Sequence, residues 1–444
     1  MTSAIATDSH RHKRTTLMAY GIPALPLAAL LLPVYIYLPS YYADDLGLGL
    51  AVVGLVRLVS GLFDVFTDPL VGMMSDRSKN RFGRRKIFVV LGAPVTMLGT
   101  WMLLVPSGSP GFIYMMMWSC VMYLGWTMMY LPLSAMSTEL THGYHERSRL
   151  AAYREGMSAL GTLLILALVS YISISEGEQD VARAVWAIAI FVCCGLPLSI
   201  LLFMWRVPDP QLTKKERKRI GFYKGIKILK KNKPFTKLIF NYSLNSFANG
   251  LPAILIIMFV ENVVGNEEAV GPYLFAYFLC GLVFLPFWIK LSNKITKHKA
   301  WCISMGWACL VFLAVPFVGE GDTTLFMAIC ILSGMAVGAD LALPSSMQAD
   351  VVDIDLAETG ERRAGLYFAM WSMMTKLSLA LAAGISLPVL DYMGWPEENA
   401  FAIVILYALV PITVKLIVIF NMWRYPLDRA ALSAIQLRKE QLAS

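Results

Sequence analysis

Two aspartates, Asp64 and Asp68, lie four residues apart inside an apolar run that extends from about Leu48 to Met74. The run is long enough to cross a bilayer as a helix, and the spacing places both carboxyl groups on one helical face. Two charged carboxylates are costly at that depth, so facing carboxyl groups either share a proton or hold a cation between them. The pattern predicts an ion-binding site. The structural alternative is one neutral acid beside a second acid paired with an arginine.

The composition is typical of an integral membrane protein. The chain of 444 residues is 57% hydrophobic, with a mean hydropathy of +0.61, and long apolar runs recur along all of it. None of the seven cysteines has metal-ligand spacing, and the five histidines fall in predicted loops or the N-terminal tail. The sequence offers no nucleophile–base pair, metal cluster or phosphate loop, so we expect neither an enzyme nor a cofactor beyond a coupling ion.

The apolar stretches predict an all-α membrane protein with about twelve transmembrane helices, several of them longer than the roughly 20 residues that a span needs. The predicted limits are 16–43, 48–75, 86–106, 111–140, 149–173, 182–206, 235–262, 267–290, 300–318, 323–346, 364–388 and 398–423. A basic segment divides them, which predicts four parts: a six-helix bundle over 1–206, a cytoplasmic linker over 207–233, a second six-helix bundle over 234–424 and a cytoplasmic tail over 425–444.

The positive charges predict the orientation of the chain. If the twelve helices cross the membrane in alternating directions, 33 of the 38 Lys and Arg residues outside or inside the spans fall on one side of the membrane. By the positive-inside rule this side is cytoplasmic, together with both termini. We therefore attribute the net charge of +8 to topology and to contact with anionic lipid rather than to nucleic acid.

Three sequence blocks, in order along both halves, carry a family resemblance. They are Asp64-x-x-x-Asp68-Pro69-x-x-Gly72-x-x-x-Asp76-Arg77 with Arg81-Phe-Gly83-Arg84-Arg85, Leu131-Pro132 to Glu139 with Glu146-Arg147 and Tyr153-Arg154, and Asp350-Val-Val-Asp353 with Gly360-Glu361-Arg362-Arg363. Together they resemble the glycoside–pentoside–hexuronide:cation symporters of the major facilitator superfamily. The resemblance implies two six-helix bundles that rock about a central site, the usual plan of secondary transporters.

The resemblance also implies a cation site. Asp64 and Asp68 match the cation-coordinating aspartates of the family, Thr67 stands where a relative has an asparagine near the ion, and Thr127 matches a threonine that completes the site. Carboxylate and hydroxyl oxygens are hard ligands suited to Na⁺, Li⁺ or H₃O⁺, and the residues leave the choice of ion open.

Two basic residues within predicted spans are candidate charge partners of this site. Lys376 matches a lysine near the family's ion site, and within a span it needs a carboxylate partner such as Asp64 or Asp68; the alternative is snorkelling to an interface. The family's arginine before the first aspartate is replaced by Gly61. Arg57, nearly two turns before Asp64, either takes over its role or is a helix-end residue.

The expected solute site departs from the family pattern. Sugar-transporting relatives carry aspartates where this chain has Ala28 and Tyr130, and a pocket tryptophan becomes Ser134. Losing two carboxylates removes strong acceptors for sugar hydroxyls. Arg154 matches a pocket arginine, and Asp340 either replaces a lost acceptor or pairs with a loop arginine at the cytoplasmic end of its helix.

A polar stripe crosses the predicted seventh helix. Asn241, Asn245 and Asn249 recur at intervals of four residues on an otherwise apolar span. Amides donate and accept hydrogen bonds, which suits a polyhydroxyl solute; the alternative role is hydrogen bonding between helices.

The resemblance further implies a cytoplasmic gate of charge pairs that break when the inward side opens. The candidate residues are Asp76, Arg77, Arg84, Arg85, Glu139, Arg147, Asp350 and Arg362. Glu139 with Arg147 and Asp350 with Arg362 are possible pairs, with the pairing left open.

The sequence thus favours a cation-coupled (Na⁺ or H⁺) secondary symporter, working as a monomer in the cytoplasmic membrane with a small organic solute, a monovalent cation and lipid as partners. The expected solute is a glycoside or a related sugar derivative. The alternatives are a lysolipid-like or anionic amphiphilic solute, and a non-transporting sensor on the same fold.

Overall fold

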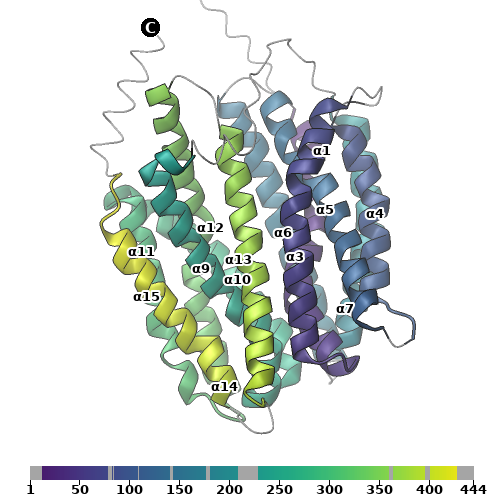
Figure 1. The fold of residues 1–444 in the computed structure, drawn as a ribbon, viewed down its shortest axis with the longest axis vertical. Helices are drawn as coiled ribbons and strands as arrows, with labels where there is room; N and C mark the ends of the chain where they lie inside the picture. Colours follow the sequence, from purple (N-terminus) through teal and green to yellow (C-terminus); the bar gives the residue numbers. More distant parts are fainter. Residues whose placement is uncertain are drawn as a thin grey trace, which may run out of the picture. The chain divides into compact units, whose positions relative to one another are not determined.

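A computed structural model describes residues 13–78, 83, 85–108, 110–140, 144–176, 181–208, 229–359, 364–395 and 401–427. Helices account for nearly all of this part of the chain (Figure 1). The bounds in the first half are α1 Arg14–Gly21, α2 Ala24–Ser40, α3 Leu50–Arg77, α4 Lys86–Leu104, α5 Phe112–Leu140, α6 Tyr144–Glu176 and α7 Val181–Arg206. In the second half they are α9 Lys233–Phe259, α10 Val270–Lys294, α11 Lys297–Phe312, α12 Thr323–Thr359, α13 Ala364–Tyr392, α14 Phe401–Val404 and α15 Val410–Trp423.

Twelve segments of the described chain are long and apolar enough to cross a membrane, which confirms the predicted number of spans. Several ends differ from the prediction. α12 continues to Thr359 instead of ending near residue 346, and α11 begins at Lys297 instead of residue 300. The histidine assignment was partly wrong, because His145 and His298 lie in the first turns of α6 and α11 rather than in loops.

Most of the long helices contain an internal proline. Proline removes one backbone hydrogen bond, a defect that membrane helices tolerate because neighbouring groups satisfy the freed carbonyl. The residues are Pro69 in α3, Pro94 in α4, Pro132 in α5, Pro197 in α7, Pro252 in α9, Pro286 in α10, Pro344 in α12 and Pro388 in α13. Short π-helical turns end two of the spans, over Tyr41–Asp45 and Val260–Val264, and a third, Ile405–Leu409, joins α14 to α15 within the last span.

The chain divides into two compact units. The first contains residues 1–38, 63–168 and 181–216, and the second contains residues 39–62, 169–180 and 217–444. Segments 39–62 and 169–180 therefore belong with the C-terminal helices, although they lie within the first predicted bundle. The bundle boundaries at 206 and 234 stay a prediction.

Within the first unit, α4 and α5 pack along a seam of small residues. A Cβ on Gly125 would lie 2.4 Å from the backbone nitrogen of Thr96, and one on Gly99 would lie 2.6 Å from Met122. Such distances are shorter than any real carbon contact, so only glycine permits this approach, as is usual where membrane helices pack. The seam fixes α5, which carries Thr127 and Tyr130.

Within the second unit, α9, α11, α12 and α15 lie side by side (Figure 1). α10 packs closely on α12, where a Cβ on Gly334 would lie 2.4 Å from the carbonyl oxygen of Tyr277 and one on Gly338 would lie 2.5 Å from that of Gly281. The beginning of α3 packs on α13 in the same unit: a Cβ on Gly61 would lie 2.5 Å from the Cβ of Ala380.

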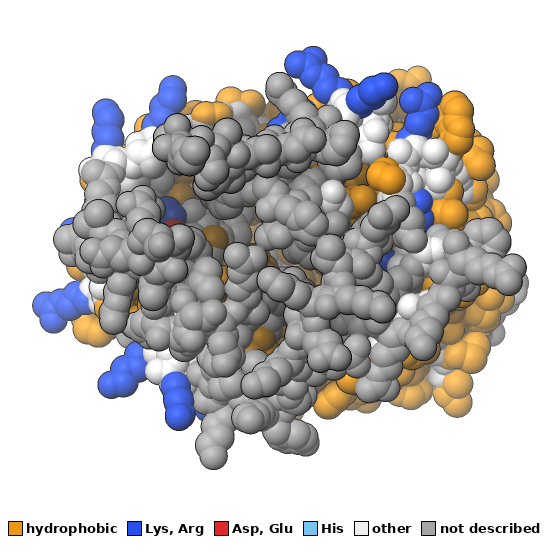
Figure 2. Space-filling model, turned by 90° about the horizontal axis from the view of Figure 1, so that it is seen from above, with side chains coloured by type: hydrophobic (Ala, Val, Ile, Leu, Met, Phe, Trp, Pro, Cys, Tyr) orange, Lys and Arg blue, Asp and Glu red, His pale blue; other side chains and the backbone are white. Residues whose placement is uncertain are grey.

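Figure 2 views the end of the molecule at which Figure 1 marks the C-terminus, and on its described part Lys and Arg side chains stand among hydrophobic ones. Basic side chains at a helix end, next to an apolar lateral surface, are typical of the boundary between lipid hydrocarbon and water. The membrane orientation of this end stays a prediction.

Candidate functional site

The predicted acid pair lies in the first unit and is buried. Asp64 and Asp68, on the second half of α3, are 2% and 9% exposed, and Thr127 of α5 is fully buried between them. The Thr127 hydroxyl lies 2.7 Å from Oδ1 of Asp64 and 3.0 Å from Oδ1 of Asp68. The structure therefore brings together three of the four residues assigned to a cation site, from two helices.

The hydrogen count at Thr127 favours an additional positive charge at this place. A hydroxyl group has one proton, so it donates to one carboxylate only. The other carboxyl oxygen also lies at hydrogen-bond distance from the Thr127 oxygen, a contact that a proton on that carboxyl group or a shared cation makes favourable. One proton or one monovalent cation, shared by Asp64, Asp68 and Thr127, satisfies both contacts and lowers the charge of the buried pair.

Thr67, the fourth residue of the set, is oriented differently. Its hydroxyl donates to the backbone carbonyl of Asp64 at 3.0 Å, and the side chain is 7% exposed. This bond is local to α3 and leaves the hydroxyl lone pairs available. Its assignment as a cation ligand stays a prediction.

A second group of predicted residues lies elsewhere in the first unit. The rings of Tyr130 and Trp126 stack on α5 with centroids 4.4 Å apart, and the Arg154 guanidinium of α6 lies 5.8 Å from the Tyr130 ring centroid. Arg154 also forms a 2.6 Å ion pair with Glu155, which is 62% exposed and therefore screened by solvent. Tyr130, the position at which the resemblance implies an aspartate in sugar-transporting relatives, thus lies in a cluster of aromatic and cationic side chains.

The second unit contains a buried polar network around Asp340 of α12. Its carboxylate accepts hydrogen bonds from Nε1 of Trp301 at 2.6 Å, from Nδ2 of Asn245 at 3.1 Å and from Nδ2 of Asn249 at 3.0 Å. Asp340 is thus held by α9 and α11 within its own unit. This arrangement replaces the cytoplasmic loop arginine that the sequence offered as an alternative partner.

Lys415 of α15 completes this network, and the sequence interpretation did not assign it. Its ammonium group donates to Oδ1 of Asn245 at 2.8 Å and to Oδ1 of Asn249 at 2.6 Å, and it lies 3.9 Å from Oδ2 of Asp340. Each asparagine therefore bridges a carboxylate and an ammonium group. The available signal was a lysine inside an apolar span, which implies an acidic partner.

The asparagine stripe of α9 separates into two parts. Asn245 and Asn249 belong to the Asp340 network, whereas Asn241 donates to the carbonyl of Lys237, one turn back on its own helix, at 2.7 Å. Oδ1 of Asn241 is buried without a hydrogen-bond partner among the described residues. Spacing alone placed all three on one face, but only two of them reach the acid.

The two basic residues predicted as charge partners both lie in the second unit. Arg57, on the first half of α3, is 2% exposed, and Lys376, on α13, is 9% exposed. Their burial agrees with a role inside the protein rather than at an interface with water. Gly61, which replaces the arginine of relatives, lies against Ala380, so a long side chain has no room there. Pairing of Arg57 or Lys376 with the aspartates of α3 stays a prediction.

Part of the predicted gate lies within the described residues. Asp350 of α12 forms an ion pair with Lys297 of α11 at 2.6 Å, a partner that the sequence did not suggest. In the first unit, Lys86 donates to the carbonyl of Val207 at the C-terminal end of α7, a common role for lysine there. Arg85 precedes it as the N-cap of α4. The side chains of Asp76, Arg77, Glu139 and Arg147, and residues Arg84 and Arg362, lie outside the described part.

Comparison with known proteins shows which family the chain resembles. Residues 19–429 match the family model described as MFS/sugar transport protein. An uncharacterized symporter of Synechocystis is 26% identical and covers 83% of both chains, and the sodium-dependent lysophosphatidylcholine symporter 1 of Gallus gallus is 22% identical over 93% of this chain and 86% of its own.

The solved structure of the nucleoside transporter NupG is similar in fold, with a TM-score of 0.68 at 13% identity, covering 93% of this chain and all of NupG. The match confirms the expected architecture of a membrane transporter, and the family is one of transporters rather than enzymes. The chain belongs to the MFS/sugar transport protein family, in its glycoside–pentoside–hexuronide branch of the major facilitator superfamily.

Proposed function

We propose that this protein is a secondary symporter of the cytoplasmic membrane that couples the entry of a monovalent cation, Na⁺ or H⁺, to the transport of an organic solute. The observation that carries the proposal is the position of the Thr127 hydroxyl, 2.7 Å and 3.0 Å from two buried carboxyl groups. Three hard oxygen ligands at one buried point suit a small cation. Similarity to relatives named as symporters supports it further.

Coupling follows from the charge of the pair. Asp64 and Asp68 are both buried, so a cation bound between them lowers the cost of their negative charge. A bound cation reduces this charge and allows a conformation that is competent for solute binding. Because linkage is reciprocal, the solute tightens cation binding by the same factor that the cation tightens solute binding.

Within this class we favour a glycoside or a related sugar derivative as the solute. The family description and the mixed surface of Trp126, Tyr130 and Arg154 support this choice, because small-molecule sites combine aromatic walls with a few polar groups. The absence of aspartates at Ala28 and Tyr130 means that other groups must bind the sugar hydroxyls.

A lysolipid-like solute is the second candidate. Similarity to the sodium-dependent lysophosphatidylcholine symporter of Gallus gallus over 93% of the chain favours it. The aromatic and cationic surface at Tyr130 and Arg154 is compatible with an amphiphile that carries an anionic group.

Uptake into proteoliposomes tests the coupling directly. The purified protein is offered labelled glycosides and lysolipids under an imposed inward Na⁺ gradient, an inward H⁺ gradient, or neither. The proposal predicts accumulation above equilibrium with one cation gradient in the wild type and its loss in Asp68→Asn. Gradient-driven accumulation that persists unchanged in Asp68→Asn contradicts the proposed coupling site. A wild type that accumulates no solute under any gradient favours a non-transporting sensor.

A further inference from the structure

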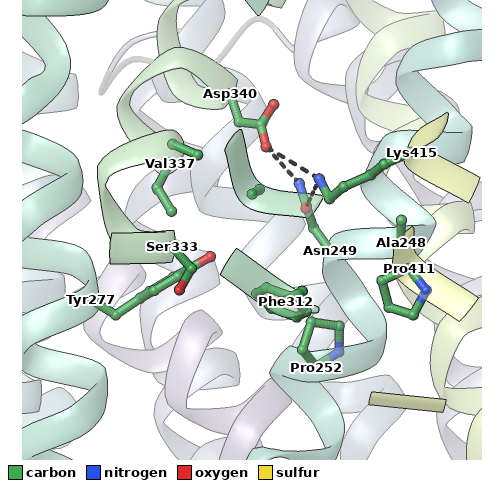
Figure 3. A pocket seen from close by; sticks show the side chains of 12 residues that line it. Ala248, Asn249, Pro252, Tyr277, Phe312, Ser333, Val337, Asp340, Pro411 and Lys415 are labelled. Atoms are coloured by element: carbon green, nitrogen blue, oxygen red, sulfur yellow. Dashed lines mark hydrogen bonds and ion pairs between the residues drawn. The ribbon is translucent and has the colours of Figure 1, made fainter. Parts of the chain in front are cut away.

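The pocket of the second unit, beside the Asp340 network, is a small cavity. Its volume is about 30 Å³, room for about one water molecule. Residues of α9, α10, α11, α12 and α15 line it. Asp340, Asn249 and Lys415 form its polar wall and already contact one another (Figure 3). The charges of this interior site are therefore matched within the second unit.

Basic side chains at one end of the second unit are not matched in this way. Lys233 and Lys237 lie in the first two turns of α9, Lys230 and Lys231 precede that helix, and Arg424 follows the last residue of α15. None of them forms an ion pair within the part of the chain that the structure describes. Figure 2 shows this end of the molecule, where basic side chains stand beside hydrophobic ones at the rim. The ends of α9 and α15 therefore present a concentrated positive charge that lacks a described counter-charge.

Side-chain bonds to backbone carbonyls hold the ends of α9 and α15 together. The Lys237 ammonium donates to the carbonyl of Arg424 at 2.9 Å, and the Tyr425 hydroxyl donates to the carbonyl of Pro234 at 3.2 Å. The first bond satisfies a carbonyl at the end of α15 and brings Lys237 to Arg424. Lys233 lies one turn before Lys237 on the same face of α9. The positions of three cationic residues from two helices therefore converge.

Exposed aromatic side chains continue this surface away from the helix ends. On α9, Phe240 is exposed and lies seven residues after Lys233, on the same helical face. On α15, Phe420 is exposed one turn before Arg424, and Trp423 is exposed beside it. Both phenylalanines lie about one helical turn, or about 5 Å, further along their helices than the nearest cation. Each helix thus presents positive charge at its end and an aromatic ring one turn further in.

This order of charge and aromatic surface is complementary to a phospholipid. One candidate membrane span begins at Lys233 and another ends at Trp423, so the cations lie at the level of lipid head groups. Phosphate oxygens accept charge-assisted hydrogen bonds from ammonium and guanidinium groups. Aromatic side chains at this depth contact the glycerol and the first part of the acyl chains. Lys and Arg clusters immediately outside a span are typical of sites for anionic lipids.

We propose that the ends of α9 and α15 bind one anionic phospholipid of the adjacent leaflet, with its phosphate group at Lys233, Lys237 and Arg424 and its acyl chains along Phe240 and Phe420. The site consists of other residues than the proposed cation and solute sites, and it goes beyond the proposed function. The bound phosphate offsets the mutual repulsion of the cations. A zwitterionic lipid binds less well, because its own ammonium group is repelled by the same cations.

Native mass spectrometry of the purified protein tests the site by counting bound lipid. Protein in detergent is titrated with phosphatidylglycerol, or with phosphatidylcholine that carries the same acyl chains. The site variant is Lys233→Gln with Arg424→Gln, which removes two charges and keeps the bond of Lys237 to the backbone of α15. The matched control is Lys290→Gln with Lys294→Gln, which removes two exposed charges one turn apart at the end of α10.

We expect wild type to bind phosphatidylglycerol more tightly than phosphatidylcholine. The site variant loses about tenfold or more of the affinity for phosphatidylglycerol, because each basic residue near an anionic head group contributes to binding. The control variant keeps the wild-type affinity. Equal binding of the two lipids by wild type overturns the proposal, as does an equal loss in the two variants, which shows attraction spread over the whole end. Displacement of the lipid by an equal concentration of soluble glycerol 3-phosphate also overturns it, because the site then binds a free phosphate group.

Discussion

At the scale of single residues, Thr127 is the group that contacts both acids of α3. Its single hydroxyl proton serves two carboxyl oxygens, at 2.7 Å and 3.0 Å. A proton or a cation at the other contact makes that contact favourable as well. We propose that the coupling ion supplies this positive charge and that Thr127 and both acids bind it together.

This role predicts the effect of removing the hydroxyl. Thr127→Val keeps the shape of the side chain but removes a hydrogen bond to a charged group, worth about 1.5–3 kcal/mol. The apparent affinity for the coupling cation therefore falls by about tenfold or more. Thr127→Ser keeps the hydroxyl group and therefore retains most of the affinity for the coupling cation. The measurement is solute uptake as a function of cation concentration.

Thr67→Val provides the comparison on the same helix. Its hydroxyl donates to the backbone of Asp64 rather than to a carboxylate, so its loss weakens cation binding less than Thr127→Val does. A larger effect at Thr67 than at Thr127 contradicts the assignment of Thr127 as the shared ligand.

Local spacing predicted the acid pair, because an interval of four residues defines a helical face whatever surrounds it. Local spacing did not predict that Lys415 contacts Asn245, Asn249 and Asp340, because these residues lie on helices far apart in the sequence. It also did not separate Asn241 from Asn245 and Asn249. A side chain's rotamer and its neighbours on other helices decide which polar groups meet, and periodicity contains no information on either.

At the scale of helices, the close approach of α10 and α12 keeps the pocket of the second unit in shape. The approach depends on Gly334 and Gly338, whose positions leave no space for a Cβ. The same helices contribute Tyr277, Ser333 and Asp340 to the pocket. Backbone packing at the seam and geometry at the pocket are therefore linked.

Gly334→Ala forces α10 and α12 apart. We expect a loss of about 1–3 kcal/mol of stability, the usual cost of overpacking, and a lower midpoint of thermal unfolding in detergent. Gly306→Ala on α11 is the control, because a Cβ there meets open space. It leaves the midpoint unchanged or raises it slightly. Equal midpoints for the two variants would show that the seam does not support the fold as described.

Hydropathy predicted where helices exist but not where several of them end. α12 extends to Thr359, beyond the predicted limit of 346, because its last turns leave the apolar stretch and remain helical. A bilayer sets a minimum length for a span and no maximum for the helix that contains it. Apolar composition therefore marks the span, and local backbone hydrogen bonding marks the helix.

At the scale of the whole molecule, the number of spans followed from the apolar runs and the thickness of a bilayer, and the family motifs predicted the transporter architecture that the similarity to NupG supports. The two compact units divide α3, which contributes residues before 63 to one unit and residues after 62 to the other, while the predicted bundle boundaries stay a prediction. Sequence order assigns a helix to one bundle, whereas packing can divide it between two.

The charge asymmetry of the loops predicts the topology of the molecule in the cell. A cysteine-free variant with Ser107→Cys reacts with a membrane-impermeant maleimide in intact cells, because this position follows α4 on the side with few basic residues. Ser444→Cys reacts only after permeabilisation. Labelling of Ser444→Cys in intact cells would show that the chain has the opposite orientation in the membrane.

The central claim is that the buried acid pair of α3 binds and releases a positive ion. Infrared difference spectroscopy of the purified protein in lipid measures this through the carbonyl band of a protonated carboxyl group. We expect a band that disappears when Na⁺ is added or when the pH is raised, and that is altered or lost in Asp64→Asn and in Asp68→Asn. A spectrum that responds to neither Na⁺ nor pH, or responds identically in both variants and wild type, contradicts the claim.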